Sequence, residues 1–264
     1  SKVGLMGHSM GGAVLALVLN ESSSAPSKNP GYKCALGFAP VNPSLAVTNT
    51  VVTVPIGLVS GMGDTLTPPY LHATPYYSSL VPADGLKFHY KLDTVATHMN
   101  LVGLGPVNPV IFERSLKIMN GFFGQFLNGS RAGLESILGV DGLSETHLAS
   151  LDRQTVVPQA WSDGELRVGG QTRVSVSAEA GFAGLIIASN VASPTATSVG
   201  SLLLDPSSAV PLAETLIVGN RLDVIITVPA LSQLIGTSFA IQGGGATINE
   251  PFKLGSALSF TIGS

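Results

Sequence analysis

A serine at position 9 lies at the centre of a Gly-x-Ser-x-Gly element, within the run Gly7-His8-Ser9-Met10-Gly11-Gly12. Apolar residues precede this run and continue after it through 13–19. The pattern predicts a buried strand that turns sharply into a buried helix beginning at about Met10, with Ser9 at the bend. Gly7 and Gly11 lack side chains that would collide in so tight a turn. Ser9 is therefore a candidate nucleophile, and the Met10 N–H is a candidate oxyanion donor.

A serine hydroxyl needs a base and an acid that orients the base. The apolar run 51–60 predicts a second strand, and Asp64 follows it in a Gly63-Asp64-Thr65 turn. The segment 86–93 alternates apolar and polar residues, which predicts a half-exposed edge strand. His98 lies on the next loop. The order Ser9, Asp64, His98, each after its own strand, predicts a catalytic triad.

Other residues offer weaker alternatives. Asp93, at the end of the alternating strand, is the rival acid, and Asp84 has the composition of a structural turn. His89 is expected on the solvated side of the alternating strand, and His72 and His147 are expected at the surface. His8 either lines the substrate cleft or packs beneath the nucleophile. The tyrosines after the acid turn are expected either at the rim of the cleft or in the framework; they are Tyr70, Tyr76 and Tyr77.

Residues 1–127 resemble the second half of an α/β-hydrolase catalytic domain. The run from Gly7 to Gly12, the turn at Asp64 followed by Pro68, and Thr97-His98 resemble most the dienelactone-hydrolase-like branch. That branch includes cutinase-like polyester hydrolases and relatives of platelet-activating-factor acetylhydrolase. True dienelactone hydrolases have cysteine at the nucleophile position, so Ser9 argues against that substrate. The resemblance implies that Ser9 attacks an acyl carbonyl, His98 moves the proton and Asp64 fixes the imidazole tautomer.

The resemblance also implies several strands before the nucleophile and a second oxyanion amide from an early loop. This chain starts at the nucleophile strand, so we expect an amino-terminally truncated catalytic domain. The fragment alone is then expected to hydrolyse little or nothing. Comparing it with a version extended upstream, on p-nitrophenyl butyrate, tests that expectation.

The remaining hydrolase part reads as framework. An aromatic stripe at helical spacing over 110–127 predicts a helix packed on the sheet. Cys34 lies in an apolar strand expected over 32–41, so a buried and inert thiol is expected.

Composition divides the 264 residues into two unequal parts. Residues 1–127 hold seven Lys/Arg and five Asp/Glu, a net charge of about +2, and residues 128–264 hold six and eleven, about −5. Glycines punctuate the stretch between them. The sequence therefore predicts a hydrolase part at 1–127, a linker at 128–158 and a separate domain at 159–264.

Short strand candidates at regular spacing dominate 159–264 and predict a β-sandwich or jelly-roll-like domain. Trp161 is expected to anchor its core. Gly243-Gly244-Gly245 lacks the Lys-Ser/Thr of a phosphate-binding loop. The segment resembles a module at the carboxyl ends of secreted planctomycete and myxobacterial proteins. That resemblance leaves surface attachment, substrate-surface binding and stabilisation open, and it favours an exported bacterial protein.

The predicted fold class is thus α/β for the first part, as half of a hydrolase sheet truncated at the N-terminus, with an all-β sandwich after it. No metal constellation or cofactor motif is recognisable, and a formal charge of −3 gives no sign of nucleic-acid binding. No apolar run approaches a membrane span. The favoured function is a serine carboxylic-ester hydrolase, acting on a small-molecule, lipid or polyester ester. The alternative is a binding or structural protein whose β module carries the role and whose hydrolase part is a relic.

Overall fold

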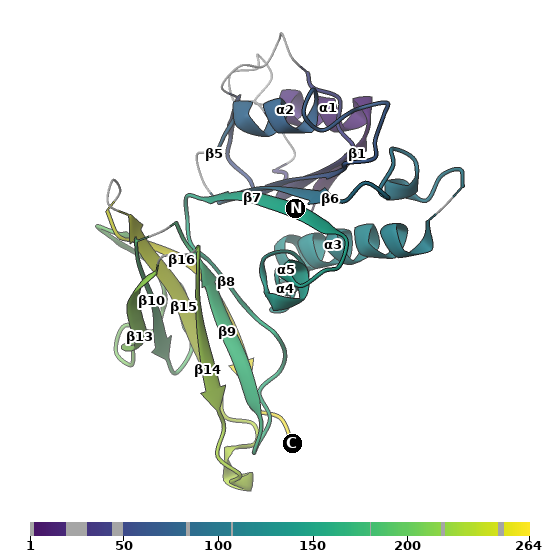
Figure 1. Ribbon diagram of the computed structural model, residues 1–264. Coiled ribbons are helices and arrows are strands. Elements are labelled where there is room, and N and C mark those ends of the chain that lie inside the picture. The colour runs from purple at the N-terminus through teal and green to yellow at the C-terminus, as the bar shows by residue number, and fades with distance from the viewer. Residues whose placement is uncertain are drawn as a thin grey trace. The chain divides into compact units, whose positions relative to one another are not determined.

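The computed structural model describes residues 3–19, 31–43, 50–82, 85–106, 108–179, 181–217, 220–247 and 251–264. The chain forms two compact units, Ser1–Gln154 and Thr155–Ser264. Each unit is described by itself below (Figure 1).

Unit 1 is built on a five-stranded sheet. Its strand order is β1 (Gly4–His8), β2 (Cys34–Phe38), β4 (Ile56–Gly61), β6 (Leu86–Leu92) and β7 (Leu148–Thr155). The pairs β1–β2, β2–β4 and β4–β6 are parallel. The carboxyl ends of these four strands therefore lie at one edge of the sheet, and the loops that follow them meet there.

Helices cover both faces of this sheet (Figure 1). The helices α1 (Met10–Leu19) and α2 (Ala73–Ser79) lie on one face, and α3 (Pro109–Asn128) lies on the other. In α1, Leu15, Ala16 and Leu19 pack in one apolar cluster with residues of β2 and β4. On the other face, the ring of Phe122 in α3 meets that of Phe88 in β6 edge to face, with centroids 5.5 Å apart. The aromatic stripe therefore packs α3 on the sheet, as predicted.

The ends of α3 follow from its sequence. The Asn108 side chain accepts hydrogen bonds from the N–H groups of Val110 and Ile111, and Pro109 occupies the first turn. Gly129 ends the helix with a φ of 69°, a conformation that glycine adopts without strain. These signals place α3 within two residues of the predicted helix.

The strand predicted over 51–60 is in fact two strands. Residues Thr50–Val52 form β3, which pairs in parallel with β5 (Leu80–Pro82) in a separate two-stranded sheet. The central strand β4 begins only at Ile56. Pro55 lies between them and has no N–H to donate to a ladder, which gives a physical reason for the break.

The prediction that 86–93 is a half-exposed edge strand is wrong. Strand β6 lies between β4 and β7, and every residue in it except Lys91 is buried. Each of its polar side chains has at least one partner inside the protein, although among the described residues His89 Nδ1 has none. Lys87 Nζ donates to the carbonyls of Tyr77 and Leu80, Lys91 pairs with Asp152 of β7, and His89, expected to be solvated, is fully buried against Ser60.

Residues 128–158, expected to be a linker, contain regular structure. They form α4 (Glu135–Leu138), α5 (Val140–Leu143) and all of β7. A buried arginine of α3 ties α4 and α5 to the first sheet. The Arg114 guanidinium donates to Tyr90 Oη and to the Ser136 carbonyl, and Tyr90 Oη donates to the Gly142 carbonyl.

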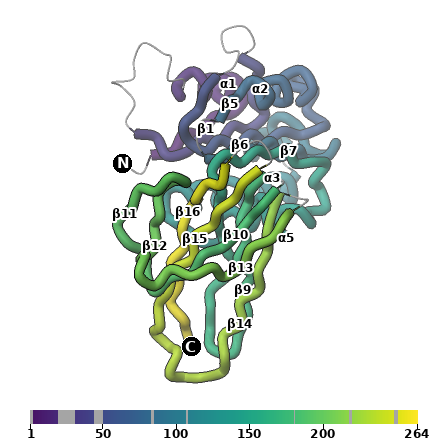
Figure 2. Tube along the Cα trace, turned by 90° about the vertical axis from the view of Figure 1, so that its left-hand side faces the viewer, coloured from purple at the N-terminus to yellow at the C-terminus, as the bar shows by residue number. Residues whose placement is uncertain are grey.

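Unit 2 consists of antiparallel sheets. One has the order β13 (Val210–Ile217), β10 (Gly181–Ala188), β15 (Ser238–Thr247) and β16 (Lys253–Thr261). Another has the order β14 (Arg221–Thr227), β9 (Gln171–Ser177) and β8 (Gln159–Ser162). A hairpin of β11 (Val191–Thr197) and β12 (Gly200–Leu204) lies beside β16, as Figure 2 shows. The buried side chain of Gln242 in β15 binds this hairpin, because it donates to the Ser201 carbonyl and accepts from the Leu203 N–H.

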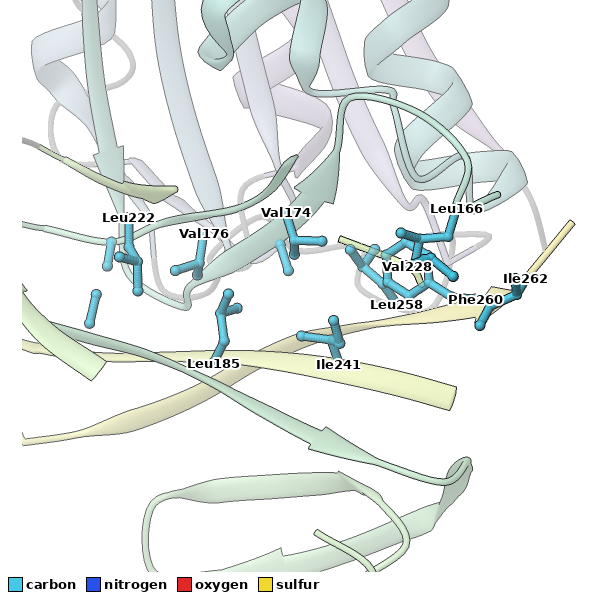
Figure 3. Close-up of a cluster of buried hydrophobic side chains, with 13 residues drawn as sticks. Leu166, Val174, Val176, Leu185, Leu222, Val228, Ile241, Leu258, Phe260 and Ile262 are labelled. Atoms are coloured by element: carbon cyan, nitrogen blue, oxygen red, sulfur yellow. The ribbon is translucent and has the colours of Figure 1, made fainter. Parts of the chain in front are cut away.

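One apolar cluster lies between these two larger sheets. In Figure 3, Leu185 and Ile241 extend from one sheet toward Val174 and Val176 of the other. Phe260 is buried in the same cluster, and Trp161 on β8 is also fully buried. The triple-glycine segment 243–245 is interior to β15, where Gly243 lies against Val176.

The predicted fold class, an α/β half of a hydrolase sheet followed by an all-β sandwich, is wrong for this chain. Strands make up 44% of the described residues and helices 22%, and the strands are distributed over several separate sheets. The structure is therefore mostly β. The prediction ended the first sheet within residues 1–127 and expected a linker after it, whereas β7 extends that sheet. Among the described residues, no helix is both long enough and apolar enough to cross a bilayer.

Candidate active site

Ser9 lies at the bend between β1 and α1 in a left-handed backbone conformation. Its φ is 56°, which is unusual for a residue with a side chain and costs about 1–3 kcal/mol. Hydrogen bonds hold the bend, since the Ser9 N–H donates to the Phe38 carbonyl at 3.0 Å and the Ser9 carbonyl accepts from Val41 at 3.1 Å. The residue is half-buried, so part of it reaches the surface.

Both Gly7 and Gly11 were expected to relieve crowding at this bend, but only Gly7 is needed for that reason. A side chain at Gly7 would overlap the Gly11 carbonyl, whereas a side chain at Gly11 would meet nothing within 4 Å. The expectation for Gly11 is therefore wrong. Gly12 is the second position where a side chain would be crowded, because a Cβ there would lie 2.8 Å from Pro40 Cβ.

Asp64 follows β4 and is buried, with 2% of its surface exposed. Its Oδ1 accepts hydrogen bonds from the N–H groups of Leu66 and Thr67, at 2.9 and 2.8 Å. The Thr67 hydroxyl donates to Oδ2 at 2.6 Å. Burial acts to raise the pKa of the Asp64 carboxyl, but the bonds from Thr67 and His98 outweigh it and hold the pKa below its usual value. Asp64 is therefore an ionised acceptor at neutral pH.

His98 lies beside this carboxylate. Its Nδ1 is 2.7 Å from Asp64 Oδ2, and its surface is 7% exposed. Because the ionised carboxylate only accepts, Nδ1 carries the hydrogen, and this assignment leaves Nε2 with a free lone pair when the ring is neutral. The pair thus has the tautomer that a general base requires.

Two close approaches bring the His98 loop against the Asp64 turn. The Gly63 N–H donates to the Ala96 carbonyl at 3.1 Å. A side chain at Gly61 would overlap that same carbonyl, and one at Gly63 would overlap the Thr94 carbonyl. The Gly-Met-Gly spacing before Asp64 therefore permits the two loops to touch.

Asn100 fixes the His98 loop from its other side. Its Oδ1 accepts from the Thr97 N–H at 2.7 Å, and its Nδ2 donates to the Val95 carbonyl at 3.1 Å. Thr67 and Asn100 are the residues that sequence reasoning missed. Asp64 with Thr67 three residues later is a local capping pattern, which was a usable signal for Thr67.

His8, expected either to line the cleft or to pack beneath the nucleophile, contacts His98. Its Nε2 lies 3.0 Å from the His98 carbonyl oxygen, and the two ring centroids are 4.5 Å apart. Burial lowers the pKa of His8, although the hydrogen bond to His98 partly opposes that shift. His8 is therefore neutral at pH 7, with Nε2–H as the donor. The residue before Ser9 thus touches the backbone and the ring of His98.

The structure does not join Ser9 to His98 by a hydrogen bond. Within the described ranges, the side-chain bonds of His98 run to Asp64 and Thr67 and none runs to the Ser9 hydroxyl. The three residues do share one edge of the sheet, since Ser9 follows β1, Asp64 follows β4 and His98 comes after β6.

The rival acid Asp93 pairs with a different histidine. Its Oδ2 is 2.9 Å from Nδ1 of His147, which is half-buried rather than fully exposed at the surface. His72 is also half-buried, and its Nδ1 accepts from the Asn42 N–H. Asp84 lies outside the described residues.

The three tyrosines after Asp64 differ in exposure, and Tyr77 is half-buried with Lys87 Nζ 4.4 Å from its ring centroid. Tyr70 is 71% exposed, so it remains available at the rim. Tyr76 is fully buried and its hydroxyl accepts from Ala16 and donates to Gly12, so it is framework. Cys34 is buried as expected, and burial raises the pKa of its thiol to about 12.

The Met10 N–H begins α1, where the first amides of a helix have no intrahelical acceptor. A helix of this length also presents the positive end of its dipole there. In the part of the chain that the structure describes, no group of three or more His, Cys, Asp or Glu residues is arranged to hold a metal ion. No family model matches the sequence, and no curated protein matches it either. The family resemblance of residues 1–127 therefore stays a prediction.

Proposed function

We propose that the protein is a serine hydrolase that cleaves carboxylic esters through Ser9, His98 and Asp64. The observation that supports the proposal most is the 2.7 Å hydrogen bond between Asp64 and His98, at the sheet edge that also carries Ser9. If Asp64 and His98 formed only a structural ion pair, the φ of 56° at Ser9 would have no role. A nucleophilic serine at a strand-to-helix turn adopts such a strained conformation.

The reaction would proceed in two halves. Ser9 Oγ attacks the ester carbonyl while His98 Nε2 takes its proton, and negative charge develops on the carbonyl oxygen near the Met10 N–H. The C–O bond to the alcohol then breaks, and His98 returns the proton to the leaving alcohol. Water attacks the acyl-enzyme with His98 again as the base, which releases the acid and restores Ser9.

The surroundings favour an uncharged, apolar ester. Residues 61–82 and 94–106 contain Asp64 as their only acidic or basic residue apart from histidines. Large apolar side chains beside the three residues are exposed, including Met10 at 74%, Leu66 at 67% and Tyr70 at 71%. A substrate with charged groups would find no partner for them in these segments.

The test is covalent labelling of the full-length protein with a fluorophosphonate probe, read by peptide mass spectrometry. We expect label on Ser9, no label in Ser9→Ala or His98→Ala, and ordinary labelling in Ser78→Ala. Ser78 is a matched control because it is exposed and, among the described residues, its hydroxyl bonds only to the Thr74 carbonyl of its own helix. Hydrolysis of p-nitrophenyl butyrate should fall in parallel by at least 10³-fold.

An unlabelled Ser9 in folded protein would contradict the proposal. It would instead support the alternative in which the β module carries a binding or structural role.

A further inference from the structure

An apolar cavity of about 230 Å³ lies in unit 1 next to His8. Its walls come from the end of β1, the end of β2, η2 (Asn100–Val102) and one side of α3. The apolar residues that line it include Met6, Phe38, Leu101, Phe112, Leu116 and Met119. For comparison, an engineered apolar cavity of about 150 Å³ holds benzene. The space therefore suits a short aliphatic chain or one aromatic ring.

One polar side chain in the lining has no partner. Ser115, on α3, is 2% exposed, and its Oγ makes no hydrogen bond within the described residues. A buried hydroxyl without a partner costs about 1–3 kcal/mol. Serine in a helix often bonds the carbonyl four residues before it, but this hydroxyl does not. A ligand that carries one hydrogen-bonding group could supply the missing partner.

The cavity adjoins the proposed catalytic residues. Gly7 and His8 line it and immediately precede Ser9. Leu101 and Val102 line it and follow His98 by three and four residues. His8 also contacts His98 directly. A chain attached to a carbonyl carbon at Ser9 would thus reach this cavity by passing His8.

We propose that this cavity binds the acyl chain of the ester substrate, and that the enzyme is specific for uncharged acyl groups of about four to eight carbons. The inference rests on the proposed function, which supplies the ester. None of the lining residues is acidic or basic apart from His8, so a carboxylate placed there would lose its hydration without gaining a cation. The pocket should therefore select against charged acyl chains.

The first experiment measures binding without catalysis. Ser9→Ala protein is titrated with 1-hexanol and with hexanoate, and binding is followed by saturation-transfer NMR and calorimetry. We expect hexanol to bind at least tenfold more tightly than hexanoate. Leu116→Trp should weaken hexanol binding at least tenfold, because the half-buried Leu116 lines the cavity and the larger ring fills it. Lys117→Trp is the matched control, since Lys117 is exposed on the same helix and does not line the cavity.

Ser115→Ala refines this experiment. It should weaken hexanol binding severalfold and leave benzene binding unchanged, because benzene cannot use the hydroxyl. If circular dichroism shows that Leu116→Trp is unfolded, Met119→Trp replaces it, since Met119 is also half-buried in the lining.

The second experiment measures chain-length preference in protein with Ser9 intact. Leu116→Trp should lower kcat/KM for p-nitrophenyl hexanoate at least tenfold relative to p-nitrophenyl acetate, whereas the control Lys117→Trp should leave that ratio unchanged. Equal loss on both esters, or no hexanol binding in Ser9→Ala, would overturn the acyl pocket alone. Hexanol binding without any labelling of Ser9 would overturn the proposed function, and with it the assignment of the occupant as an acyl chain.

Discussion

At the scale of single residues, the candidate site depends on groups that hold Asp64. Three hydrogen bonds from Leu66 and Thr67 reach this carboxylate in addition to the one from His98. The bonds from Thr67 and His98 keep the carboxyl ionised although it is buried, which is the opposite of what burial alone would do. The tautomer of His98 therefore depends on Thr67, a residue that need not touch substrate.

Thr67→Val tests this positioning role. Loss of the hydroxyl removes the 2.6 Å bond to Asp64 Oδ2 and should raise the pKa of the carboxyl. We expect kcat for p-nitrophenyl butyrate to fall about tenfold, or 1.4 kcal/mol, with little change in KM. Thr65→Val is the matched control, because Thr65 is exposed in the same turn. Rates equal to those of the control would exclude the role.

His89 provides a second test, of stability against pH. Burial lowers the pKa of His89 to about 3, and the nearby Lys91 adds to the shift. Above about pH 6.5 the imidazole is neutral in both the folded and the unfolded chain, so it makes no contribution to the pH dependence. As the pH falls from 6.5 toward 3, only the unfolded chain binds the proton, so the free energy of unfolding decreases.

We therefore expect His89→Gln to lose less stability than the unmodified protein between pH 7 and pH 4.5. The difference should be roughly 2.5 kcal/mol in urea unfolding, and glutamine retains a hydrogen-bonding group for Ser60. If His89→Gln lost as much stability over this pH range as the unmodified protein does, the expected neutral, buried His89 would be contradicted.

At the scale of elements, sequence patterns located several segments and misjudged their surroundings. The apolar runs predicted β1, α1 and α3 near their observed bounds, because each carries its own signals for beginning and end. The alternation in β6 was identified as a strand but assigned to an edge. An alternating pattern shows which side chains are polar but not whether they face solvent. In β6 the polar side chains bond to Tyr77, Ser60 and Asp152, and only the tertiary fold brings these residues close to the strand.

The same limit applies to the candidate site. Ser9, Asp64 and His98 were predicted from their places after strands, and the structure joins the last two by a hydrogen bond. For His8, the second histidine at the site, the sequence left two roles open, because its contact partner His98 lies 90 positions away along the chain. The fold class was wrong in part because the first sheet continues beyond residue 127 into β7, in a segment that was expected to be a linker.

The nucleophile turn gives a prediction at this scale, from two adjacent glycines of α1. Gly11→Ala should raise the free energy of unfolding by up to about 1 kcal/mol, because alanine favours helix and its Cβ meets nothing within 4 Å. Gly12→Ala should lower it by about 1–3 kcal/mol, because its Cβ would lie 2.8 Å from Pro40 Cβ. Thermal denaturation followed by far-UV circular dichroism measures both, and a destabilising Gly11→Ala would show that Gly11 serves another purpose.

At the scale of the whole molecule, the two units have separate apolar cores. Unit 1 buries Leu15, Ile56 and Leu58 in one cluster, and unit 2 buries Val174, Ile241 and Phe260 in another. A domain that has its own hydrophobic core can unfold in a separate cooperative transition. The chain also carries a single tryptophan, Trp161, which is buried in unit 2. Its fluorescence therefore reports on unit 2, whereas far-UV circular dichroism reports on both units.

These two signals allow a reciprocal test of independence. Phe260→Ala should destabilise unit 2 by about 3–5 kcal/mol and shift the midpoint of the Trp161 fluorescence transition to lower urea. Phe122→Ala removes a fully buried ring from unit 1, so it should shift the circular dichroism transition and leave the fluorescence midpoint in place. If the two units were one cooperative structure, both variants would instead move the fluorescence midpoint to the same side, since a loss in either core would then be shared by the whole chain.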